Sequence, residues 1–301
     1  MRFLDKIKQK FIEQSTTNIN FVFVRHGYGC HNAIGNLINN KLITSENAKQ
    51  LLQSHLIDPE LTELGINASI SNGNIIASIL KSLNRIFKNK NLNMDEMNVI
   101  GCSPLIRSME TAYFMSRDWV NPPKKIYVFP LLREIDESST DKYSQRSFKI
   151  METTPSYAMK SIIEQKKYLR SIGLLDMFDF SFIEKYSELR REPGDISKFI
   201  NWFVINYMSQ IQQRDNLNVF IITHAGVLKD YSHQGFTNNS GFVLNGRLKN
   251  NNKFKSNKYI PLDQFLPKEF FKEYYKSKWN NKSNYCPSNR CGNGKLCELL
   301  N

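Results

Sequence analysis

The segment FVFVRHGYGCHN, residues 21–32, concentrates side chains that can do chemistry. Arg25 and His26 follow an apolar run directly, and Cys30 and His31 come a few residues later. A guanidinium can clamp a phosphate, whereas an imidazole or a thiolate can act as a nucleophile or ligate a metal. Cys30 lacks an Arg at the spacing of a Cys-x-x-x-x-x-Arg thiolate loop, and a zinc site would need further ligands from elsewhere. Arg25 and His26 are therefore the stronger candidates, and we expect His31 to line the mouth of a pocket.

Short apolar runs alternate with amphipathic stretches along the chain, and this alternation predicts a layered α/β fold with a mainly parallel sheet. Thr62 and Asp195 are expected as N-caps of two helices, and Ser103 as a cap near the start of a third. The predicted strands cover residues 21–24, 98–101, 126–129 and 218–223, and the predicted helices cover about 62–88, 105–118 and 195–212.

Polar side chains stand where each predicted strand ends. His26 follows the first strand and Ser103 the second; Glu134 comes soon after the third and His224 directly after the fourth. In a parallel sheet, ligands bind at the carboxyl ends of the strands. Four distant segments are therefore expected to bring their polar residues to one edge of the sheet.

Five ordered stretches resemble those of the histidine phosphatases, also called the phosphoglycerate mutase-like superfamily, and in particular its broad-specificity phosphatase branch. The likeness extends over about residues 20–247 and implies a three-layer α/β/α fold with a mainly parallel central sheet. The stretches are RHGYGCHN, DPELTELG at 58–65, CSPLIRSMETA at 102–112, PLLRE at 130–134 and ITHAG at 222–226.

The resemblance implies catalytic roles for three residues. His26 would attack phosphorus and form a phosphohistidine, and His224 would donate hydrogen bonds to the transferring group. Glu134 would protonate the leaving oxygen and then accept a proton from the attacking water. The nearby carboxylates Asp136 and Glu137 are alternatives for this last role.

Phosphate binding is implied for a second set of residues. Arg25 and Arg107 would neutralise the phosphoryl charge through bidentate contacts. Asn32 would add a phosphate contact or position the loop, and Gly27 would let the backbone approach the phosphate closely.

The expected activity is that of a histidine acid phosphatase-type phosphomonoesterase that needs no metal and no cofactor. The segment REIDESSTDK, after the third strand, departs from the Glu-Arg-x-Tyr-Gly-like run of the cofactor-dependent mutases. This departure favours hydrolysis over mutase activity. Two alternatives stay open: a phosphoglycerate mutase-type phosphomutase, and a module that binds a phosphorylated ligand without turnover.

Three segments lie outside the five stretches that carry the resemblance. Residues 1–19 read as an amphipathic segment, and residues 137–194 as an insertion with helical patterns and the aromatic run MFDFSF, expected to cover the site and shape substrate choice. Residues 248–301 form a basic extension, in which 249–258 is expected as a loop and 267–279 as a helix.

Five cysteines do not suggest a disulfide framework, because Cys30 and Cys102 lie in the body and the other three crowd the end. For the tail with Cys286, Cys291 and Cys297, an unstructured end is expected, with a redox clip or an incomplete zinc site as alternatives. The first 18 residues lack the apolar block and the small-residue cleavage site of a signal peptide, and no apolar run reaches membrane-spanning length, so a cytoplasmic, reducing location is expected.

The formal net charge of +13 favours anionic partners. The expected partner is a phosphorylated small molecule or a phosphoprotein substrate. Residues 249–301 hold eleven Lys or Arg against four Asp or Glu, so +7 of the charge lies there, and contact with nucleic acid or membrane through this extension is a further option. The sequence makes no prediction of the oligomeric state.

Overall fold

The computed structural model describes residues 17–54, 56–87, 97–122, 124–135, 159–208, 216–248, 253–266, 290–292 and 295–296. The expected amphipathic segment up to residue 16, most of the first half of the insertion and the expected helix over 267–279 lie outside these residues. So do Asp136, Glu137, Cys286 and Cys297.

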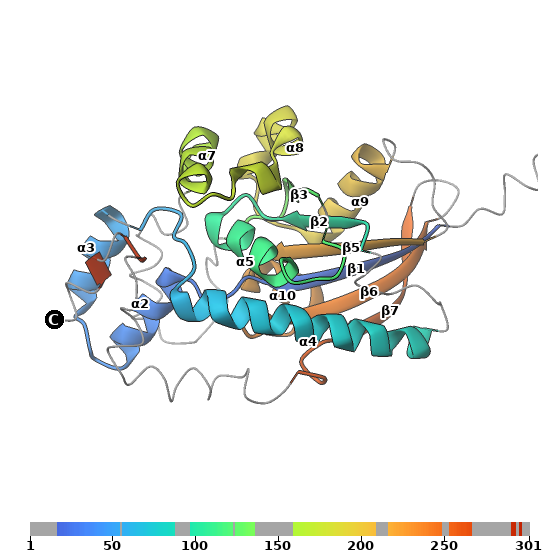
Figure 1. Cartoon of the computed structure of the whole chain (residues 1–301), viewed down its shortest axis with the longest axis horizontal. Coiled ribbons are helices and arrows are strands. Elements are labelled where there is room, and N and C mark those ends of the chain that lie inside the picture. Colours follow the sequence, from blue (N-terminus) through green and yellow to red (C-terminus); the bar gives the residue numbers. More distant parts are fainter. Residues whose placement is uncertain are drawn as a thin grey trace, which may run out of the picture.

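A seven-stranded sheet in the order β4-β3-β2-β5-β1-β6-β7 forms the centre of the molecule (Figure 1). Neighbouring strands are parallel from β4 to β1, whereas β6 pairs antiparallel with β1 and with β7. The prediction of an α/β fold with a mainly parallel sheet is confirmed. The strands are β1 (Asn18–Arg25), β2 (Val99–Cys102), β3 (Ile126–Val128), β4 (Phe178–Asp179), β5 (Asn216–Thr223), β6 (Gly241–Leu248) and β7 (Phe254–Pro261).

Alternating side chains of the central strands pack into two hydrophobic cores, one on each face of the sheet. In β1, Val22 and Val24 pack in a cluster with apolar residues of α4 and α5. Phe21 and Phe23 point the other way, into a cluster with α9 and α10. Helices therefore cover both faces, as a three-layer α/β/α fold requires. These helices are α4 (Glu63–Phe87), α5 (Ile106–Ser116), α9 (Ile196–Asn206) and α10 (Ala225–Ser232).

Two helices begin as their local sequence predicts, and one does not. Thr62 Oγ1 accepts the Gly65 N–H at 2.9 Å, and Asp195 Oδ1 accepts the Lys198 N–H at 2.9 Å. For α5 the cap position is Leu105, and the Ile106 N–H donates to the buried carboxylate of Asp58 at 2.8 Å. The expectation that Ser103 caps this helix is therefore wrong, because a carboxylate from a distant segment takes that place.

The described part of the insertion adds the short strand β4, which pairs with β3 as the outermost strand on that side of the sheet. It also contributes α7 (Ile162–Ser171) and α8 (Ser181–Lys185). The aromatic run is buried in the cores: Phe178 and Phe180 lie on one side and Phe182 on the other. These rings stabilise the fold and are not available to contact a substrate.

The C-terminal extension differs from its expected structure in two places. Residues 254–258, expected as part of a loop, belong to β7, which pairs with β6 along most of its length. Cys291 forms a disulfide with Cys30 and is buried, so the expectation of no disulfide and a loose end is wrong here.

A third apolar cluster explains why the tail is held. Cys291 and Leu296 pack with residues of α2 (Cys30–Asn39) and α3 (Ser45–Ser54), and in Figure 1 the red C-terminal pieces lie beside these helices. Within the described residues, no helix has the length and apolar character needed to cross a membrane.

Candidate active site

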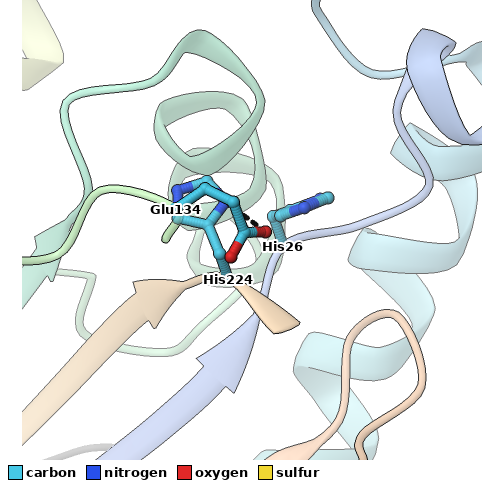
Figure 2. A group of neighbouring side chains, drawn as sticks. All are labelled: His26, Glu134 and His224. Carbon is cyan, nitrogen blue, oxygen red and sulfur yellow. Dashed lines mark ion pairs between the residues drawn. The ribbon is translucent and has the colours of Figure 1, made fainter. Parts of the chain in front are cut away.

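The register of β1 and β5 brings His26 and His224 together. These strands are parallel neighbours whose last paired residues are Arg25 and Thr223, so each histidine is the next residue of its strand. The His26 N–H donates to the Thr223 carbonyl at 2.9 Å, and the two imidazole centroids are 5.1 Å apart. The prediction that distant segments deliver both histidines to one edge is therefore correct in its geometry (Figure 2).

The hydrogen bonds of His26 define which ring nitrogen is free to react. Its Nδ1 lies 2.7 Å from the Gly27 carbonyl oxygen, and a carbonyl can only accept, so Nδ1 carries the proton. Nε2 then presents a lone pair, towards which Arg107 Nε points at 3.3 Å. Burial, and after it the charge of Arg107, lowers the pKa of His26 well below 6.5. His26 is thus a neutral imidazole at neutral pH, and Nε2 is the ring nitrogen that carries the lone pair.

His224 is completely buried between two hydroxyl groups and a carboxylate. Its Nε2 lies 2.7 Å from Ser103 Oγ and 3.3 Å from Ser108 Oγ, and its Nδ1 lies 3.8 Å from Glu134 Oε2. Because a hydroxyl can donate or accept, the contact of Nε2 with Ser103 is compatible with either neutral tautomer of His224. Burial is the main cause that lowers the pKa of His224, and Arg107 adds to it.

Glu134 reaches the two histidines because the start of α10 leaves room for it. The Gly226 N–H donates to Glu134 Oε1 at 3.1 Å. A Cβ at Gly226 would lie 2.7 Å from that same oxygen, so only glycine admits the carboxylate. With its side chain 13% exposed, Glu134 is accessible enough to exchange a proton with water. Glu134 therefore lies beside the histidines and is partly exposed to solvent.

Two guanidinium groups give the site its positive potential. Arg107, on the first turn of α5, is 1% exposed, and Arg25, at the end of β1, donates from Nη1 to the Phe236 carbonyl at 2.8 Å. Both charges lower the pKa of His26 and of His224. A site that disfavours protonated imidazoles in this way favours an anionic ligand.

The loop after β1 is positioned by residues that sequence reasoning only partly found. Asn32 Oδ1 accepts the Gly29 N–H at 3.0 Å, in agreement with its expected role in positioning the loop. Asn238, which sequence reasoning missed, donates from Nδ2 to the carbonyls of His26 and Gly27 at 3.0 and 3.1 Å. It lies in a connection between α10 and β6 that carries no recognisable motif.

The packing of its own loop requires a glycine at position 27. A Cβ at this position would lie 2.5 Å from Ser69 Oγ on α4 and 3.1 Å from Asn239 Oδ1. Close packing of the loop on α4 explains the glycine without any phosphate. The Gly27 N–H donates to Thr111 Oγ1 at 2.9 Å, so it is already used inside the protein.

Of the other candidates of the opening motif, His31 lies beside His26, and Cys30 is part of a disulfide. His31 is 7% exposed, with its ring centroid 5.4 Å from that of His26, so it lies beneath the surface rather than at the pocket mouth. Cys30 is bonded to Cys291 and is neither a nucleophile nor a ligand. Ser103, by contrast, was predicted at the right strand end, and its contact with His224 makes it part of the site.

One alternative use of the site is metal binding. His26, Glu134 and His224 each offer a ligand atom, and these atoms lie within 4.8 Å of one another. The neighbouring charges of Arg25 and Arg107 oppose a cation at this place and favour a tetrahedral oxyanion. The chemistry of the donor set therefore fits a phosphoryl group better than a metal ion.

No family model and no curated protein matches the chain. Solved structures with a similar fold include a mycobacterial hydrolase 1, 11% identical, with a TM-score of 0.39, over 82% of this chain and 99% of the other. They also include the protein histidine phosphatase SixA in complex with tungstate, 12% identical, with a TM-score of 0.31, over 83% and 100%. A third is a mycobacterial glucosyl-3-phosphoglycerate phosphatase, 13% identical, with a TM-score of 0.33, over 80% and 96%. Because these TM-scores lie below 0.5, the chemistry of this chain rests on its own residues.

Proposed function

We propose that this protein is a phosphomonoester hydrolase of the histidine phosphatase family that works through a phosphohistidine on His26. The observation that supports the proposal is the state of His26: a neutral ring whose Nδ1–H is bonded to a carbonyl and whose Nε2 carries the lone pair. A second imidazole lies 5.1 Å away, and Arg107 points at the nucleophilic nitrogen. The order of the five sequence stretches supports the same family.

In the first step, Nε2 of His26 attacks phosphorus and the bond from phosphorus to the ester oxygen breaks. Glu134 donates its proton to the departing oxygen, so that the leaving group is an alcohol. Arg25 and Arg107 neutralise the charge of the phosphoryl oxygens, and Nδ1–H of His224 donates to one of them. These groups are fixed before the substrate arrives, so little reorganisation is needed.

In the second step, a water molecule attacks the phosphohistidine. Glu134, now a carboxylate, accepts a proton from that water, and the bond between phosphorus and Nε2 breaks. Inorganic phosphate leaves, and His26 returns to its neutral state. No step requires a metal or a cofactor, and the substrate is a phosphorylated small molecule or a phosphoprotein.

The test is turnover of p-nitrophenyl phosphate in the presence of EDTA. We expect activity in the wild type and a loss of at least about a thousandfold in His26→Ala, because the covalent path is removed. The matched control is His233→Ala, since His233 is exposed on the surface. Activity that survives His26→Ala, or that disappears with EDTA and returns with a divalent metal, would contradict the proposal.

A mutase would pass the phosphoryl group to a second substrate instead of water. Supplying 3-phosphoglycerate with a trace of the bisphosphate separates the two reactions. Hydrolysis predicts free phosphate without faster formation of the isomer, whereas the opposite ratio would identify a mutase.

A further inference from the structure

The C-terminal residues 290–292 and 295–296, which we call the C-terminal clasp, contact both segments that carry catalytic side chains. The first link is the disulfide between Cys291 and Cys30, which joins residues 261 positions apart. Cys30 is the first residue of α2 and comes only four residues after His26. The tail is therefore covalently attached to the loop of the nucleophile.

The second link is a buried ion pair between Arg290 and Glu110. Glu110 is fully buried on α5, one turn after Arg107, and its carboxylate is paired with the Arg290 guanidinium. Tyr168 donates its hydroxyl to Glu110 Oε1 at 2.7 Å, and the Leu61 N–H donates to Oε2 at 2.7 Å. The tail thus supplies the cation that compensates a buried charge on the helix of Arg107.

A strand-like segment over residues 60–62 connects the two links. Glu60 Oε1 accepts the Cys291 N–H at 2.8 Å, and the Glu60 carbonyl accepts the Cys30 N–H at 3.0 Å. Arg290 Nε donates to the Leu61 carbonyl at 2.7 Å. The clasp, the 60–62 segment, the nucleophile loop and α5 therefore form one hydrogen-bonded unit.

We infer that the C-terminal clasp positions His26 and Arg107 relative to each other, and that its disulfide makes turnover depend on the thiol redox state. The inference rests on the proposed function. Its basis is that the clasp holds the two segments whose side chains meet at 3.3 Å, between Arg107 Nε and His26 Nε2. Arg290 and Cys291 are thus positioning residues and touch no substrate.

Opening the clasp is a reduction by a dithiol. One thiolate of the reagent attacks a sulfur of the Cys30–Cys291 bond, and its second thiol resolves the mixed disulfide. The two cysteines become thiols by gaining two electrons and two protons, and the reagent becomes a cyclic disulfide. Because both sulfurs are buried, the tail must open locally before the attack. Cytoplasmic thiols would act on this bond, whereas it would persist in an oxidising compartment.

The experiment compares wild type with Cys291→Ser, with and without dithiothreitol, below the melting temperature of every form. We expect reduction of the wild type to lower kcat/KM for p-nitrophenyl phosphate by about tenfold or more, since small misplacement of catalytic groups has large effects. Reoxidation should restore it. Cys291→Ser should start at the low value and not respond, whereas Cys286→Ser and Cys297→Ser should behave like wild type.

A second variant pair separates positioning from stabilisation. Arg290→Met should lower kcat and weaken inhibition by vanadate, and Arg290→Lys should restore part of both, because it keeps the charge beside Glu110. Lys166→Met is the control, since its ion pair with Glu184 is on the surface. If any clasp variant fails to fold, the reduction arm on the wild type gives the answer.

Each outcome bears on one proposal or the other. A disulfide reduced according to mass spectrometry, with kcat, KM and vanadate inhibition unchanged, overturns the clasp inference and leaves the hydrolase intact. Absence of the Cys30–Cys291 bond in oxidised, folded protein overturns it as well. A wild type without turnover, but with vanadate binding that weakens on reduction, would contradict the proposed function and support the clasp.

Discussion

The active site and the C-terminal clasp both bury charged groups contributed by distant segments, but they balance these charges differently. In the clasp, the buried carboxylate of Glu110 meets a guanidinium, a hydroxyl and a backbone N–H. In the candidate active site, two guanidiniums lie beside neutral imidazoles, and burial first and then these charges lower the pKa of each histidine. The negative charge of Glu110 is balanced by groups of the protein itself, whereas the positive potential of the candidate active site favours an anionic ligand.

This difference predicts opposite effects of substitution in the two regions. Removing one partner of a compensated buried ion pair leaves the other charge without its counterpart, which typically destabilises a protein by about 3–5 kcal/mol. Removing a charge from a site preorganised for a ligand mainly affects ligand binding and turnover. Stability should therefore depend more on the clasp, and activity more directly on the site.

The largest expected effect is that of Arg107→Met on turnover. We expect kcat/KM for an aryl phosphate to fall by about a hundred- to a thousandfold, because a preorganised donor to the transition state is lost. The free energy of unfolding should change less than in Arg290→Met, and urea unfolding measures both. The control is Arg117→Met, since Arg117 is an exposed residue at the end of the same helix. An Arg107 variant that loses more stability than the Arg290 variant would remove the contrast between the two regions.

A smaller effect is expected for Ser103→Ala. The Ser103 hydroxyl lies 2.7 Å from Nε2 of His224, and in the proposed mechanism it donates to this nitrogen, so that the ring proton stays on Nδ1. We expect kcat to fall about tenfold, since an unmade hydrogen bond at a buried polar group is worth about 1–3 kcal/mol. The pH profile of kcat should also shift, which a purely structural loss would not produce.

Ser116→Ala is the matched control for Ser103→Ala. Ser116 is also buried, but its hydroxyl donates at 2.8 Å to the Ala112 carbonyl within α5, far along the helix from the histidines. Its replacement should leave kcat and the pH profile unchanged. Equal losses of kcat in the two variants would show that Ser103 acts through the fold alone.

The same two regions show how far sequence reasoning reaches. The meeting of His26 and His224 was predictable because each lies at the end of an apolar run, and parallel strands place such residues at one end of the sheet. Helix starts at Thr62 and Asp195 were predictable because a cap depends on three or four neighbouring residues. Ser103 was assigned to the right strand end but to the wrong role, since Asp58 comes from a segment that no local pattern links to α5.

The clasp could not be read from the sequence in this way. Cys30 and Cys291 are 261 residues apart, and nothing in their local surroundings indicates that they pair. Strand β7 was missed for a related reason, because its central residues are exposed and several are lysines, so it lacks an alternating apolar pattern. Lysines on an edge strand are a common protection against pairing with other chains, but they resemble the composition of a loop.

The smallest expected effect, and the most direct measure of the electrostatic contrast, is the pH dependence of stability. Burial lowers the pKa of His26, His31 and His224 well below 6.5 in the folded state. Between these lowered values and about 6.5, the unfolded chain binds more protons than the folded protein, so stability is lost as the pH falls. The stability contributed by neutral histidines is fully present only above the unfolded pKa.

Variants isolate this contribution from that of the carboxylates. Burial raises the pKa of Asp58 and of Glu110, and these groups act in the opposite direction at lower pH. Thermal unfolding between pH 7.5 and 5.5 should therefore be compared between wild type, His224→Gln and His233→Gln. Loss of one buried histidine should lower the slope of the free energy of unfolding against pH by up to about 1.4 kcal/mol per pH unit, or about 2–4 °C in Tm per pH unit. His233→Gln is the control at an exposed position.

A bound anion should reduce the pH dependence of stability, because its negative charge offsets the positive charges that disfavour protonated imidazole. Sulfate is a suitable probe, since it stays a dianion over this range, and its stabilisation of the wild type should be greater at pH 6 than at pH 7.5. In Arg107→Met, sulfate should stabilise the protein equally at both pH values. Arg290→Met should keep the greater stabilisation at pH 6, as long as it folds. Equal stabilisation by sulfate at both pH values in the wild type would mean that the histidines do not face the anion, and the contrast with the clasp would no longer hold.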